Sequence, residues 1–311
     1  MASSAASALF SPSRWDRIDA LAGDASVRRY SRLSRAGRTA ILVEYPESVR
    51  DRLARDLDVL SWCRDRGIRV PDVVAVDLSG GRAILEDLGT DDAETALGRM
   101  SPAERSAFVE RALRPLERLA ELPPDGLPAW NPPLDEARMR WELAGFELWF
   151  IRHHRSRCPS AELSRWLDDV ASQVGRHPTR VCHRDYHLNN LLVSAGGDVG
   201  VIDIQDILVG PDTYDAVSLV YERSAVRLLS VAEQQAVLEK WALRTGARPG
   251  WRRRAELVRI QRGLKVLGTF ARFVIAGDRR YEPWLGELSA TLAELLAGAA
   301  APPETVAFLL D

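Results

Sequence analysis

The feature of this sequence that most restricts its fold is a pair of polar motifs enclosed by apolar residues. The stretch "VCHRDYHLNNLLV" occupies residues 181–193, and "GVIDIQD" follows at residues 200–206. Polar residues this dense rarely belong to a strand or to the buried face of a helix, so the first motif is expected to be a loop. Together the motifs read H-x-D-x-x-x-x-N, a short hairpin, and then I-D. This pattern puts Asp185 and Asn190 on one loop and Asp203 at the end of a neighbouring strand.

These three side chains match the groups that phosphoryl transfer requires. A carboxylate must orient the substrate hydroxyl, and oxygen ligands must hold Mg²⁺ against the phosphates of a nucleotide. Two aspartates and one asparagine in this arrangement supply all three groups. The sequence therefore predicts a phosphoryl-transfer site.

The same motifs resemble those of the aminoglycoside phosphotransferase-type branch of the protein-kinase-like superfamily. "HRDYHLNN" is similar to its H-x-D-x-H-x-x-N loop, and "IDIQD" is similar to its version of the kinase D-F-G. The resemblance implies that Asp185 is the catalytic base and that Asn190 and Asp203 are metal ligands, with ATP and Mg²⁺ as cofactors. It also implies an α+β, two-lobed protein-kinase-like fold, with a small antiparallel-sheet N-lobe containing one helix and a larger, mostly helical C-lobe.

The periodicity of the first part of the chain is that of a small sheet with one helix. Strands are expected over 27–33 and 39–45, joined by the turn signal "SRAGR". An amphipathic helix is expected over 48–67, and two more short strands over 70–89. We expect this part to form the N-lobe.

After Gly89 the pattern becomes helical. The predicted lobes are therefore 1–88, which clamps the nucleotide, and 89–311, which carries catalysis and substrate binding. The helix expected over 101–122 opens with a capping box. Five prolines predict an extended loop over 122–136, and helices are expected over 134–154 and 160–175.

The stretch "GDASVRRYSRL" (23–33) takes the place of a glycine-rich phosphate loop. Gly23 and Ser26 would let main-chain amides and a hydroxyl approach a phosphate closely. Protein kinases also hold the phosphates with a lysine on the third strand, but residues 1–88 contain no lysine. Arg28 or Arg29 replaces it, or Mg²⁺ and main-chain amides suffice; each arginine is equally well explained as a strand residue that faces solvent.

The segment "AILEDLG" (83–89) lies where the two lobes should join. The resemblance implies that main-chain groups near Glu86 and Leu88 contact the adenine edge there.

The acceptor is predicted from charge and from a second resemblance. Aminoglycosides are polycations and need an acidic pocket, whereas residues 251–285 are basic. Several phrases, among them "GDASVRRYSRL", "ELAGFELWFIRHH" and "QRGLKVLGTFAR", resemble the bacterial anomeric kinases for N-acetylmuramate and N-acetylglucosamine. That resemblance implies ATP-dependent phosphorylation of the C1 hydroxyl, which gives a sugar 1-phosphate for cell-wall sugar recycling. Residues expected to contact the sugar are Trp149, His153, Tyr186, His187, Asn189, Asp206, Lys265 and Arg272.

Other interpretations of these residues stay open. Trp149 fits core packing, and Lys265 and Arg272 fit a solvated helix face. Asp206 is equally well explained as a structural residue. His183 and His187, with the nearby cysteines, fit a zinc site, although a scaffold role is favoured for His183 and a buttress of the catalytic loop for Asp215. The whole chain also fits a kinase for another alcohol, such as an aminoglycoside or amino alcohol, or a non-catalytic pseudokinase.

The charge composition of the chain restricts the classes of molecule that it is expected to bind. The 42 basic and 44 acidic residues give a formal net charge of −2, so no global field points to nucleic acid or to a membrane surface. The expected partners are a small-molecule amino sugar and a nucleotide, with no obligate protein partner. Three cysteines without a CxxC pair, and no signal-peptide or membrane-spanning pattern, predict a cytoplasmic protein.

Overall fold

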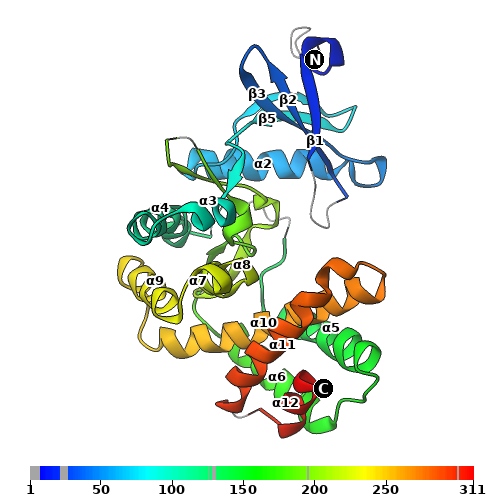
Figure 1. Cartoon of the computed structure of the whole chain (residues 1–311), viewed down its shortest axis with the longest axis vertical. Helices are drawn as coiled ribbons and strands as arrows, with labels where there is room; N and C mark the ends of the chain where they lie inside the picture. Colours follow the sequence, from blue (N-terminus) through cyan, green and yellow to red (C-terminus); the bar gives the residue numbers. More distant parts are fainter. Residues whose placement is uncertain (1–7, 22–26, 125, 128–130, 195, 300) are drawn as a thin grey trace. The chain divides into compact units, whose positions relative to one another are not determined.

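The computed structural model describes residues 8–21, 27–124, 126–127, 131–194, 196–299 and 301–311 (Figure 1). The chain divides into two compact units. The first comprises Met1–Asn131 with Leu188–Ile207, and the second comprises Pro132–His187 with Leu208–Asp311. The catalytic motif is thus shared, since Asp185 belongs to the second unit and Asn190 and Asp203 belong to the first. The predicted lobes, 1–88 and 89–311, stay a prediction.

The first unit is built on a five-stranded antiparallel sheet in the order β1-β2-β3-β5-β4. Its elements are η1 (Pro12–Arg14), β1 (Arg17–Leu21), β2 (Arg29–Arg35), β3 (Arg38–Glu44), η2 (Glu47–Val49), α2 (Arg52–Asp65), β4 (Val73–Asp77) and β5 (Arg82–Glu86). The predicted four strands and one helix are confirmed. The edge strand β1 was not predicted because "RIDAL" is short, half polar and mostly exposed.

Alternating residues of this sheet face two small cores. Leu33, Ala40, Ala75 and Ile84 fill one face. Val43, Tyr45 and Ala83 fill the other together with Leu53 of α2. The helix α2 therefore covers only one face of the sheet. It also packs against η5, in the loop after β9.

The rest of the first unit positions the two predicted metal ligands. It contains β6 (Asp91–Asp92), α3 (Ala93–Arg99), α4 (Pro102–Glu121), η4 (Leu188–Asn190), β8 (Leu191–Val193), β9 (Val199–Val201) and η5 (Ile204–Asp206), and β6, β8 and β9 form a second sheet. The capping box predicted at the start of α4 is confirmed by Ser101 and Glu104.

The second unit is mostly helical, as predicted. Its elements are α5 (Glu136–Gly145), η3 (Phe146–His154), α6 (Ala161–Gly175), β7 (Thr179–Cys182), β10 (Leu208–Pro211), α7 (Tyr214–Tyr221), α8 (Arg223–Leu228), α9 (Val231–Arg244), α10 (Trp251–Ile275), η6 (Arg279–Tyr281), α11 (Glu282–Ala297) and α12 (Pro303–Leu310). The long helix α10 packs against α5, η3, α6, α7 and α11, which makes it the centre of an extensive apolar core (Figure 1).

The helix predicted over 134–154 is confirmed, but its second half winds as a π-helix, η3. Along η3, Phe146 stacks on Phe150 with ring centroids 5.5 Å apart, and Trp149 stacks on His153 at 5.3 Å. Helical periodicity predicts the helix but not its π-winding.

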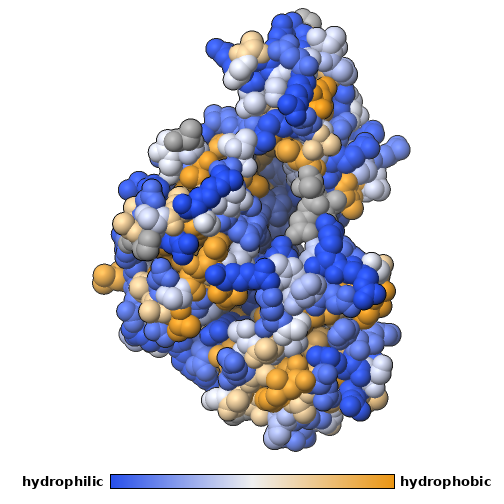
Figure 2. Space-filling view, in the orientation of Figure 1, coloured by the Kyte–Doolittle hydropathy of each residue, from blue (hydrophilic) through white to orange (hydrophobic). Residues whose placement is uncertain are grey.

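Hydrophilic residues cover most of the face drawn in Figure 2, and the apolar residues on it form separate patches. Among the described residues, no helix is both long and apolar enough to span a bilayer.

Candidate active site

The loop that carries Asp185 is fixed by a buried carboxylate. Asp215, in the first turn of α7, accepts hydrogen bonds from the main-chain N–H groups of His183 (2.6 Å) and Arg184 (2.9 Å). Arg184 has a φ of 79°, a conformation that a non-glycine residue adopts only when its surroundings hold it there. The imidazole Nδ1 of His183 accepts from the main-chain N–H of Asp185 at 3.3 Å. The predicted roles of Asp215 as a buttress and His183 as a scaffold residue are therefore confirmed.

Asp185 is surrounded by cations. Arg262 of α10 donates from Nη2 to Asp185 Oδ1 at 3.3 Å and from Nη1 to the carbonyl oxygen of Arg184 at 2.8 Å. Burial alone would raise the pKa of Asp185, but Lys265, Arg262 and Arg184 outweigh it and hold that pKa well below its usual range. The carboxylate is therefore ionised at any pH at which the protein works.

A second buried acid holds these cations in place. Glu142 of α5 is 5% exposed and accepts from Arg184 Nη2 at 3.2 Å and from Gln261 Nε2 at 3.1 Å. A buried carboxylate needs such partners, because leaving it unpaired would cost several kcal/mol (about 3–5). Glu142 thus orients the arginine beside Asp185 and links the catalytic loop to α5 and α10.

The predicted metal ligands Asn190 and Asp203 lie at the same end of one hairpin. Asn190 directly precedes β8, Asp203 follows β9, and the strands pair with Leu191 opposite Val201. The main-chain N–H of Ile202 donates to the carbonyl oxygen of Asn190 at 3.0 Å, which ties the two segments together. That Asp185 joins them around one ion stays a prediction.

The donor atoms of Asn190 and Asp203 suit Mg²⁺, which prefers carboxylate and amide oxygens. Asp203 is exposed and has a φ of 61°, in the left-handed region. Among the described residues, Arg28 and Gln205 both bind Asp203 through Oδ1, so Oδ2 can take a metal. The residues present therefore fit the ion that the motif implies.

The two arginines predicted as phosphate ligands differ sharply. Arg28 is mostly buried, and its Nη2 donates to Asp203 Oδ1 at 3.0 Å. Arg29 is exposed at the start of β2, opposite Glu44 of β3. Only Arg28 is therefore placed beside the predicted metal site. Gly23 and Ser26 lie outside the described residues.

The acidic side chains of the predicted hinge segment form ion pairs with arginines. Glu86 accepts from Arg69 Nη1 at 2.7 Å, and Asp87 accepts from Arg32 Nε at 2.7 Å. Leu88 is buried against β9, where a Cβ added at Gly200 would lie 2.6 Å from its Cδ1. An adenine would therefore have to be recognised there by main-chain groups, as the sequence predicts.

The predicted sugar-contact residues are dispersed. Tyr186 is fully buried, edge-on to the ring of His183, so its ring serves the core. His187 stays partly exposed beside Asp185, and burial lowers its pKa. The amide of Asn189 donates to Asp92 (3.0 Å) and Glu94 (2.6 Å), which gives Asn189 a structural tie.

The structure also places the other five residues that were predicted to contact the sugar. Asp206 stands near Asp56, where it adds to the rise that burial causes in the pKa of Asp56. Trp149 and His153 stack on each other along η3. Lys265 and Arg272 of α10 differ in their surroundings: Lys265 acts on Asp185, and Arg272 is exposed over Phe273.

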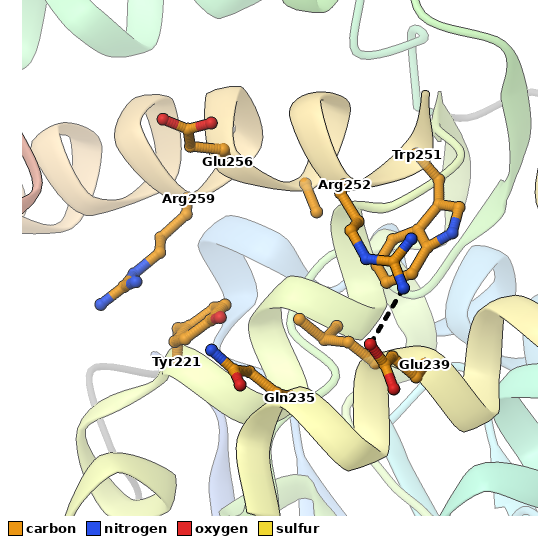
Figure 3. Close-up of a pocket in the computed structure, with 9 residues that line it drawn as sticks. Tyr221, Gln235, Glu239, Trp251, Arg252, Glu256 and Arg259 are labelled. Carbon is orange, nitrogen blue, oxygen red and sulfur yellow. Dashed lines mark hydrogen bonds and ion pairs between the residues drawn. The ribbon is translucent and has the colours of Figure 1, made fainter. Parts of the chain in front are cut away.

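A pocket of about 340 Å³ lies between α9 and α10 and is lined by Tyr221, Gln235, Leu238, Glu239, Trp251, Arg252, Ala255, Glu256 and Arg259. Figure 3 shows Arg252 reaching Glu239 across it, at 2.9 Å, and Arg259 extending beside Tyr221. None of the predicted site residues lines this pocket. The predicted site residues therefore lie outside this cavity.

Four residues that matter here were missed in the sequence: Tyr45, Asp56, Glu142 and Arg262. Glu142 and Arg262 are charged residues on the apolar faces of "RWELAGFEL" and "RIQRGLKVL", and a charge in that position signals a buried partner. Tyr45 and Asp56 have no comparable signal, because a hydrogen bond between the end of a strand and a helix depends on tertiary structure.

Known proteins similar to this chain share its motifs and its fold. A model of the phosphotransferase enzyme family matches residues 17–257. The N-acetylmuramate/N-acetylglucosamine kinase of Pseudomonas aeruginosa is 32% identical over 89% of this chain and 88% of its own length. The protein of the same name from Pseudomonas putida is 30% identical over 94% of each chain.

Solved structures bear out the fold. The aminoglycoside phosphotransferase APH(3'')-Id of Streptomyces rimosus superposes with a TM-score of 0.59 at 22% identity, over 80% of this chain and 92% of that one. The choline kinase LicA of Streptococcus pneumoniae gives 0.60 at 15% identity, over 91% and 96%. At such identities the likeness concerns the fold alone, and the predicted α+β protein-kinase-like fold is confirmed. The chain therefore belongs to the phosphotransferase enzyme family and is a phosphotransferase that acts on a hydroxyl acceptor.

Proposed function

We propose that this enzyme is an ATP-dependent sugar kinase that phosphorylates the C1 hydroxyl of N-acetylmuramate and N-acetylglucosamine, in the cytoplasm, for the recycling of cell-wall sugars. Residues 1–88 clamp the nucleotide, and residues 89–311 bind the sugar and carry catalysis. The observation that carries this proposal is the ionised carboxylate of Asp185 on a loop fixed by Asp215. The name of the relatives that match most of the chain supports the choice of acceptor.

Asp185 accepts a hydrogen bond from the acceptor hydroxyl and aims its oxygen at the terminal phosphate. Its lowered pKa makes it a weak base, so it orients the hydroxyl and receives the proton only as the bond to phosphorus forms. A hemiacetal hydroxyl at C1 releases its proton more readily than an ordinary alcohol does. The weak base and the acidic hydroxyl are therefore matched, which supports C1 as the acceptor.

On the nucleotide side, Asn190 and Asp203 would hold Mg²⁺, which neutralises the phosphates when it is bound. Arg28 adds a second positive charge beside Asp203. The main chain around Glu86 and Leu88 reads the adenine.

Lys265 is the residue proposed to separate the two sugars. It is one of only two lysines in the chain, and it lies close enough to Asp185 to lower its pKa. Muramate differs from glucosamine by a lactyl group that carries a carboxylate, which an ammonium beside the acceptor site would attract. Arg272 is exposed and is a weaker choice. Lys265→Met should lower kcat/KM for N-acetylmuramate by about tenfold more than for N-acetylglucosamine.

A substrate panel with ATP and Mg²⁺, monitored by ADP release, tests the proposal. We expect turnover with both N-acetylated sugars and little with kanamycin-like polycations or with choline-like amino alcohols. A preference for either of the latter classes would overturn the choice of acceptor. Nucleotide binding without any transfer across the panel would instead indicate a pseudokinase.

A further inference from the structure

One guanidinium joins helix α2 to the loop after β9. Arg28, which precedes β2, donates from Nη1 to Asp56 Oδ2 at 3.2 Å and from Nη2 to Asp203 Oδ1 at 3.0 Å. The hydroxyl of Tyr45, at the end of β3, donates to the same Oδ2 of Asp56 at 2.6 Å. The side chains of Arg28 and Asp56 are 14% and 17% exposed. All four residues belong to the first unit.

This arrangement resembles the ion pair that holds the phosphate-binding cation in protein kinases, but its residues come from other positions in the chain. In protein kinases a lysine on the third strand pairs with a glutamate on the N-lobe helix, and that pair holds the cation over the nucleotide phosphates. Here the first unit contains no lysine at all, and β3 ends with Glu44 opposite Arg29. Arg28 is a cation that contacts both Asp56 of α2 and Asp203, the predicted metal ligand.

The pairing is unlike an incidental surface ion pair. An exposed pair contributes little, whereas a mostly buried arginine must be held by well-placed acceptors to offset its loss of water. Arg28 has an acid at each Nη atom, and its guanidinium carbon lies 5.7 Å from the ring centroid of Tyr30 and 5.9 Å from that of Tyr45. Two rings and one acid therefore fix the arginine while its Nη2 points to Asp203.

We propose that Arg28 replaces the strand lysine as the phosphate-binding cation, and that Asp56, buttressed by the Tyr45 hydroxyl, is the residue that positions it. The planar guanidinium lets Nη1 stay on Asp56 while Nη2 leaves Asp203 for a phosphate oxygen. Mg²⁺ held by Asp203 would offset the charge of that carboxylate, which would leave Nη2 of Arg28 available to a phosphate oxygen. This inference rests on the proposed function only in requiring that a nucleotide binds beside Asp203.

Binding of ADP with Mg²⁺ to the full-length protein, measured by titration calorimetry, tests the assignment without any sugar. Arg28→Met should weaken binding by about tenfold or more, the expected loss for a hydrogen-bonded charge. Asp56→Asn and Tyr45→Phe should weaken it less, and each should raise the KM for ATP while leaving the KM for the acceptor unchanged. Asp58→Asn, an exposed aspartate on the same helix, is the matched control and should bind ADP as the wild type does.

A compensating pair separates positioning from folding. Arg28→Lys shortens the cation, and Asp56→Glu lengthens the acid by one methylene, so the double variant should bind ADP more tightly than Arg28→Lys alone. Thermal unfolding of every variant shows that it is folded. The inference is overturned if Arg28→Met binds ADP within about twofold of wild type, or if the double variant binds no better than the single one. A wrong choice of sugar would leave these results unchanged, whereas a wild-type protein that binds no ADP would contradict the proposed function as well.

Discussion

Asp185 stays ionised although it is partly buried, because Arg262, Lys265 and Arg184 surround it. Neutralising that carboxylate by Asp185→Asn should lower kcat by about 10²- to 10⁴-fold, the usual contribution of a positioned base. Because the main-chain bonds from the loop to Asp215 stay, the melting temperature should change little. Steady-state rates and thermal unfolding measure both effects, with the exposed Asp169→Asn as a control. A variant that kept the wild-type kcat would show that another group orients the acceptor.

Lys265 permits a prediction about pH. It lowers the pKa of Asp185. Protonation of this carboxylate should therefore reduce the activity of the enzyme only when the pH falls far below the usual pKa of an aspartate. Lys265→Met removes that charge, while burial still raises the pKa. The acid limb of the kcat profile for N-acetylglucosamine should therefore move to higher pH. Unchanged profiles would mean that the acid limb reports a different group or that Lys265 does not act on Asp185.

At the scale of elements, the position of α10 depends on a glycine contact with the junction of α5 and η3. A Cβ added at Gly268 would lie 2.7 Å from the carbonyl carbon of Gly145, closer than side chains tolerate. Gly268→Ala should therefore destabilise the protein by about 1–3 kcal/mol and displace α10 with Arg262 and Lys265. Denaturant unfolding and kcat measure the two effects.

Gly286 on α11 supplies the matched control for that substitution. A Cβ there meets nothing within 4 Å, so Gly286→Ala should stabilise the helix by up to about 1 kcal/mol. Equal effects of the two substitutions would argue against close packing at Gly268.

Local sequence patterns predicted the helices and strands better than they predicted strand pairing and helix packing. Alternation and turn signals gave β2, β3, β4 and β5, and the capping box gave the start of α4, because these depend on neighbouring residues. The edge strand β1 and the π-winding of η3 were missed. The first depends on pairing with β2 and the second occurs where η3 packs against α10, which periodicity does not report.

At the scale of the whole molecule, the family and the fold could be read from two motifs, whereas the electrostatics of the site could not. Asp185, Asn190 and Asp203 are predicted as site residues from the spacing of the two motifs and their resemblance to the family. The contacts that set their chemistry join residues that are distant in sequence and meet only in the folded chain: Arg28 with Asp56, Arg262 with Asp185, and Arg184 with Glu142. The substrate residues stay a prediction: Tyr186 is buried in the core, and Asn189 is hydrogen-bonded to Asp92 and Glu94.

The central claim is that the phosphoryl group is transferred to the C1 oxygen of an N-acetylated amino sugar. Phosphorus and proton NMR of the product formed from N-acetylglucosamine, and then from N-acetylmuramate, with ATP and Mg²⁺ test it most directly. The account predicts a sugar 1-phosphate, with the phosphorus coupled to the anomeric proton. A phosphate on any other oxygen, or no sugar phosphate when ADP is formed with a different alcohol, would contradict it.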